Sequence, residues 1–153
     1  MPQIIKITFI VAISYFVFGF IGQLMAIPPG NVTPIWPPSA IALSAILLWG
    51  KSAWPGIFIG AVFVNGHAIF STQINYEVLV SSMSILLIAL GSLLQPLVGS
   101  WLLTRKFSYW QLSTSTSNFV SFISNIPLMC LVSSTIGVSC LVLIDAITIR
   151  DFF

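Results

Sequence analysis

Four side chains near the ends of two apolar segments have the chemistry to bind a small ligand. Asn31, Thr33 and Trp36 lie in a proline-rich connection, and His67 lies late in a following apolar segment. Amide and hydroxyl groups beside an indole, at the positive end of a helix, suit a small polar or anionic ligand. A packing loop stiffened by prolines explains the same residues. For His67, an interfacial packing role stands beside a response to pH or ligand.

Two amide side chains occur inside apolar segments, where each needs a hydrogen-bond partner. Asn65 is two residues from His67, and two residues of helix turn by about 200°, so the two side chains face opposite ways. We expect an interhelical hydrogen bond from Asn65, with ligand contact as the alternative. Gln95 precedes Pro96, and it is expected to bond to a partner helix or to the carbonyl group that the proline leaves free.

The sequence contains no recognisable catalytic or metal-binding pattern. It has one His and two Cys, and Cys130 and Cys140 fall in one expected helix. Ten residues of helix rise about 15 Å, whereas a disulfide needs Cα atoms within about 7 Å, so these cysteines cannot pair. No carboxylate pair, activated nucleophile or phosphate-binding glycine loop is present. We therefore expect no enzyme, no cofactor and no metal.

The composition is that of an integral membrane protein. Apolar residues make up 58% of the chain, charged residues 5%, and the mean hydropathy is +1.08. A soluble domain has roughly 25% charged residues, so this chain cannot cover a water-facing surface. The formal net charge of +2 gives no indication of nucleic-acid binding. The expected surroundings are the lipid bilayer.

Five apolar runs predict an all-α, polytopic helical bundle of about five transmembrane helices. The connections between the runs are short, so sequential helices are expected to be antiparallel. The runs cover residues 7–27, 35–49, 54–70, 78–103 and 119–144.

Prolines are expected to break or start the helices at four positions. Pro37 and Pro38 are tolerated only in the first turn, so the second run is short. Pro96 and Pro127 lie inside the fourth and fifth runs, where each removes a hydrogen bond and predicts a kink.

Basic residues predict the orientation in a cell (inner) membrane. Lys6, Lys51, Arg105 and Lys106 all fall on one side of a five-helix arrangement, and Glu77 falls on the other. The positive-inside rule places the basic side in the cytoplasm. The N-terminus is then cytoplasmic and the C-terminus lies on the outer side.

Several motifs of the first four runs resemble the type-one membrane-associated sensor domain, the MASE family. The most specific are a Trp-Pro-Pro sequence and a Trp-Pro-Gly-x-x-x-Gly sequence at a fixed separation. Weaker similarity continues in the fourth run. The similar segments are residues 34–38, 41–43, 47–50, 54–61 with Asn65, and then 89–91, 94–95 and 99–103.

The resemblance implies a membrane sensory domain of the kind that precedes histidine kinase, diguanylate cyclase and phosphodiesterase modules in bacteria. The chain resembles the N-terminal half of that domain, so residues 1–153 are expected to form one partial domain without its own output module. A histidine kinase, a cyclic-dinucleotide enzyme or further helices of the same domain type are the expected partners. The alternatives are a small-molecule binding or transport subunit and a non-functional truncated membrane protein.

Overall fold

The structure is a computed structural model, and it describes residues 2–27, 33, 35–71, 78–106 and 116–143. Every element of regular secondary structure in these ranges is helical, which confirms the expected all-α membrane class. The elements are α1 (Gln3–Leu24), α2 (Pro37–Trp49), the short 3-10 helix η1 (Gly50–Ala53), α3 (Trp54–Ser71), α4 (Val78–Lys106) and α5 (Thr116–Leu143).

The number of spanning segments differs from the expectation. Four segments of the described chain are long and apolar enough to cross a membrane, so the expected five spanning helices are one too many. The reason is the length of α2, whose 13 residues make about 20 Å of helix against a hydrocarbon core of about 30 Å. Together with η1 and α3, it forms one apolar segment, Pro37–Ala68.

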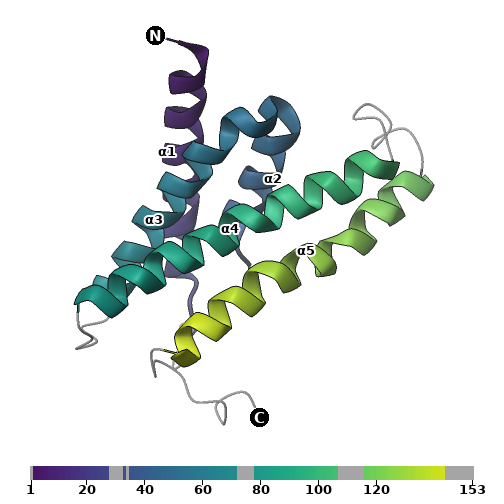
Figure 1. The fold of residues 1–153 in the computed structure, drawn as a ribbon. Helices are drawn as coiled ribbons and strands as arrows, with labels where there is room; N and C mark the ends of the chain where they lie inside the picture. The colour runs from purple at the N-terminus through teal and green to yellow at the C-terminus, as the bar shows by residue number, and fades with distance from the viewer. Residues whose placement is uncertain (1, 28–32, 34, 72–77, 107–115, 144–153) are drawn as a thin grey trace.

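Gly50 reverses the chain between α2 and α3. Its φ of 59° lies in the left-handed region, which a glycine adopts without steric cost. Its backbone N–H donates to the carbonyl oxygen of Ile46 and so closes the end of α2. The turn and the N-terminal end of α1 both lie in the upper half of Figure 1.

Glycines bring α1 and α3 into close parallel contact. A β-carbon at Gly56 would lie 2.6 Å from the carbonyl oxygen of Thr8, and one at Gly60 would lie 2.7 Å from the Cβ of Tyr15. Further along, a β-carbon at Gly19 would lie 2.6 Å from a methyl group of Val64. The contacts advance along both helices together, so α1 and α3 run in the same direction.

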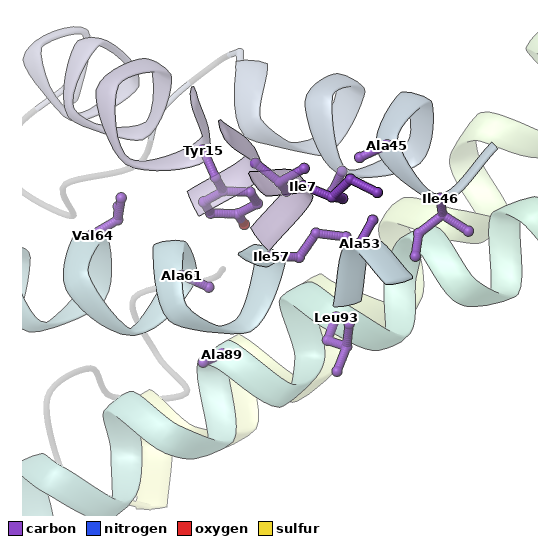
Figure 2. Close-up of a cluster of buried hydrophobic side chains, with 12 residues drawn as sticks. Ile7, Tyr15, Ala45, Ile46, Ala53, Ile57, Ala61, Val64, Ala89 and Leu93 are labelled. Carbon is purple, nitrogen blue, oxygen red and sulfur yellow. The ribbon is translucent and has the colours of Figure 1, made fainter. Parts of the chain in front are cut away.

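The apolar core lies among α1, α2 and α3, on the side where α4 packs against α2 and α3. Ala89 and Leu93 of α4 belong to one buried cluster with Ile57 of α3 and Ile7 of α1 (Figure 2). In Figure 1, α4 and α5 lie side by side, and Gly91 of α4 faces the side chain of Ile136. Many large apolar side chains point outward instead, including Phe9 at 66% exposure. Lipid is the environment that suits such a surface.

The α1–α3 contact predicts a matched pair of glycine variants. Gly60→Leu should lower the free energy of unfolding by about 2 kcal/mol, because the new side chain meets backbone atoms that cannot move aside. Gly137→Leu is the control, since no atom lies within 4 Å of a β-carbon there. Unfolding in mixed micelles, followed by circular dichroism, measures both. Equal losses in the two variants would contradict the close contact.

Candidate functional site

A buried tyrosine connects α1 to α2 and α4. Tyr15 is only 2% exposed, and its ring lies within the apolar cluster (Figure 2). Its hydroxyl group lies against the side chains of Ser92 and Trp36. This contact places the indole that precedes α2 against the middle of α1.

Gln95 connects three helices through its amide group. The Ser39 hydroxyl of α2 donates to Oε1 of Gln95 at 3.3 Å. Nε2 of Gln95 donates to Sγ of Cys130 in α5 at 3.8 Å. Gln95 itself is buried, at 6% exposure, whereas Cys130 is exposed. The structure thus brings Gln95 against partner helices, which is one of the two roles expected of it.

The start of α2 rests on the last turn of α1. Ring atoms of Trp36 lie 3.1 and 3.2 Å from the position of a β-carbon at Gly22, and Cδ of Pro37 lies 3.4 Å from it. Any larger residue at Gly22 would push the indole away. Thr33 is half-buried, and Asn31 lies outside the described residues. Of the proline-rich connection, Trp36 therefore has the best-defined position.

His67 contacts the same turn of α1 from the other side. Nδ1 of His67 lies 3.3 Å from Oε1 of Gln23, and the Nε2 group of Gln23 donates to the carbonyl oxygen of Val64 at 2.8 Å. The amide nitrogen of Gln23 is used in this bond, so its amide oxygen faces His67. An amide oxygen can only accept, so Nδ1 of His67 is the donor. The imidazole also packs edge-on against the ring of Phe20, with 5.3 Å between the two ring centres. His67 itself is exposed.

The N-terminus of α2 is poorly equipped to bind an anion. Prolines occupy its first two positions and have no N–H group. The next amide, that of Ser39, donates to the carbonyl oxygen of Trp36 at 3.1 Å. Backbone donors are what a helix N-terminus normally offers an anion. The geometry therefore favours recognition of a neutral polar ligand by side chains over the anionic alternative.

Other expected features take positions of their own. Asn65 donates to the carbonyl oxygen of Ala61, within its own helix, at 2.7 Å. Pro37 and Pro38 start α2, whereas α4 and α5 continue as single helices through Pro96 and Pro127.

The cysteines are both unpaired, as the spacing requires. In the described part of the chain, no group of three or more His, Cys, Asp or Glu side chains is placed to hold a metal.

Comparison with protein families identifies the domain. The MASE1 family model matches residues 7–153, nearly the whole chain. The chain belongs to the MASE1 family. MASE1 is a membrane-associated sensor domain of signal-transduction proteins, which confirms the resemblance seen in the sequence. Neither the curated proteins nor the solved structures gave a match to the chain.

Several polar residues of this MASE1 domain were not recognised from the sequence as members of the site. Their partners depend on how each helix is rotated in the bundle, and single hydroxyl or amide groups in an apolar run give no sign of that rotation. One signal was available for Tyr15, since it shares a helix face with Gly19 and Gly22. The unrecognised residues are Tyr15, Gln23, Ser39, Ser92 and Cys130.

The Ser39–Gln95 bond predicts a measurable coupling between α2 and α4. In a double-mutant cycle of Ser39→Ala and Gln95→Ala, we expect a coupling free energy of about 0.6 kcal/mol, the average for interhelical bonds in membranes. The control cycle pairs Gln95→Ala with Ser100→Ala, because Ser100 donates to the carbonyl oxygen of Leu97 in its own helix. The coupling free energy between Ser39 and Gln95 should exceed that between Ser100 and Gln95. Equal coupling free energies in the two cycles would contradict the bond.

Proposed function

We propose that this domain detects a small polar ligand at the end of α1 and passes the response to an output partner through its helices. The observation that carries the proposal is the contact of Trp36 and His67 with consecutive residues of α1, Gly22 and Gln23. The two side chains come from different helices, so a ligand that displaces either one changes how α2 or α3 meets α1. Asn31 and Thr33 are proposed to line the same site.

Polar contacts offer a route from this site to α5. Trp36 lies against the hydroxyl group of Tyr15, and that hydroxyl group lies against Ser92 of α4. One turn further along α4, Gln95 contacts Cys130 of α5. A ligand shifts an equilibrium only by its difference in affinity for the two states. The proposed difference is the position of Trp36 on Gly22, which sets the first turn of α2.

The proposed output partner is a histidine kinase or an enzyme of cyclic-dinucleotide metabolism in a bacterial inner membrane. MASE1 is a sensory domain and not a catalytic one, so the chemistry of the response is assigned to the partner. The domain would act on that partner by changing the arrangement of its own helices.

The proposed orientation places the ligand site outside and the basic residues in the cytoplasm. Lys51 follows α2 at the end of the bundle where η1 contacts α1, and Arg105 lies in the last turn of α4. The guanidinium of Arg105 lies 3.8 Å from the ring centre of Trp101, an arrangement suited to the membrane interface. Gly66, next to His67, lies near Ile85 at the opposite end of α4.

Reporter fusions test this orientation. Green fluorescent protein should be fluorescent when fused after Lys51 or Arg105, and alkaline phosphatase should be active after position 77, because basic residues are retained in the cytoplasm. Both reporters are fused at each of the three sites. The two are active on opposite sides of the membrane, so each one serves as the control for the other. If positions 51 and 77 report the same side, α2 and α3 form a re-entrant pair and the orientation is wrong.

Exchange of the sensor domain tests the function. In a diguanylate cyclase that carries a MASE1 domain, the helices equivalent to α1–α5 are replaced by those of this chain. Cellular cyclic di-GMP is then measured in media of different composition. We expect the level to differ between media, and Trp36→Ala or Asn31→Ala to abolish the difference because the ligand contact is lost.

The control is Phe9→Ala, which alters an exposed side chain at the other end of α1. It should leave the difference between media intact. Immunoblots of membrane fractions establish that all variants insert equally. A chimaera that inserts normally but gives the same cyclic di-GMP level in every medium would contradict a sensory role.

A further inference from the structure

A groove of about 360 Å³ lies between α1 and α2, away from Trp36 and His67. Its walls are mostly apolar, and its volume is within the range of roughly 300–1,000 Å³ that is typical of small-molecule sites. An aromatic residue lies toward each end, Phe18 on α1 and Trp49 on α2. Each wall also carries a hydroxyl group, Ser14 on α1 and Ser44 on α2.

The two hydroxyl groups lie at the same depth. α1 and α2 meet where a β-carbon at Gly19 would be 3.4 Å from Cγ of Pro38. From that contact, Ser14 is about 7.5 Å back along α1, and Ser44 is about 9 Å forward along α2, at 1.5 Å per residue. The helices are antiparallel there, so both distances lead from the contact toward the same end of the groove. The hydroxyls therefore form a pair, one on each side of the groove.

Neither hydroxyl has a hydrogen-bond partner among the described residues. Serine and threonine hydroxyls in membrane helices can donate to a carbonyl group one turn back. Five hydroxyls of α4 and α5 do so, those of Ser100, Thr104, Ser124, Ser134 and Thr135. The Ser14 and Ser44 hydroxyls remain available to a ligand, and an unpaired hydroxyl in an apolar medium is costly.

The depth of the pair indicates which molecules can meet it. Ser14 is near the middle of α1, about 15 Å from either helix end, which corresponds to the centre of a hydrocarbon core about 30 Å thick. Acyl chains at that depth carry no hydrogen-bond acceptor, and the ester groups of lipids lie at the core's boundaries. An occupant that satisfies both hydroxyls must bring hydrogen-bond acceptors, such as carbonyl oxygens, to the bilayer centre within an otherwise apolar body.

We propose that the groove binds a lipid-soluble quinone. A quinone ring has two carbonyl oxygens on opposite edges, and these match single donors on opposite walls. Its flat ring and apolar tail suit a slot between two helices with aromatic residues toward its ends. The site is separate from the ligand site at the end of α1, so it would give the sensor a second input from the membrane itself.

Fluorescence quenching by decylubiquinone tests the proposal on the full chain in lipid nanodiscs. We expect saturable quenching of tryptophan fluorescence, and Trp49→Phe should remove most of it, whereas Trp101→Phe should not. The double variant Ser14→Ala, Ser44→Ala should bind more weakly, with an apparent Kd about tenfold higher, as expected for the loss of two hydrogen bonds. Ser134→Ala is the matched control and should leave Kd unchanged, because that hydroxyl is bonded within its own helix.

A second variant guards against an effect on folding. Ser44→Leu fills the groove with an apolar side chain suited to a membrane helix, and it should abolish saturable quenching while the far-ultraviolet spectrum stays the same. Decylbenzene, which lacks carbonyl groups, should not compete. Quenching that never saturates, or an unchanged Kd in the double variant, would overturn the proposal. So would a dimer that Ser44→Leu dissociates in the absence of quinone, since the groove would then be an interface between copies.

Discussion

The close contact between α1 and α3 determines where the other helices can lie. Gly56 and Gly60 remove the side chains that would hold the two backbones apart. The approach brings the carbonyl group of Val64 within 2.8 Å of the Gln23 amide. It also buries Tyr15, whose hydroxyl then needs partners from other helices. Because the parallel pair is already formed, α2 can be short: it packs against α1 and α4.

Polar bonds in this bundle specify helix rotation more than they add stability. Interhelical hydrogen bonds in membranes contribute on average only about 0.6 kcal/mol each. The Gln95–Cys130 contact should be weaker still, since a thiol sulfur is a poor acceptor. Bonds of this strength can be exchanged at small cost. That property suits a sensor, in which two states must differ by only a few kcal/mol for a ligand to shift their populations.

Much of the fold was predictable from the sequence, and little of the site was. Long apolar runs separated by prolines and polar connections predicted five helices close to the observed bounds, because the bilayer imposes length and hydrophobicity on each of them. The number of spanning segments was overestimated, since α2 is too short to cross alone. Asn65 bonds to the carbonyl oxygen of Ala61 in its own helix, and an amide inside an apolar run does not show whether its partner lies in the same helix or in another. The shared position of Trp36 and His67 on α1 required the three-dimensional contacts of Gly22 and Gln23.

The packing of α5 explains why a response would be expected to reach that helix. Only 6% of its apolar window is buried in the described structure, against 39% for α4, because α5 packs mainly on one neighbour. Its main contact is with α4, where Gly91 and Gly99 admit the side chains of Ile136 and Met129. A change in the position of α5 therefore alters mainly its contact with α4. Gln95, which contacts Ser39 of α2 and Cys130 of α5, links the closely packed α1–α3 pair, through α2, to this outer helix.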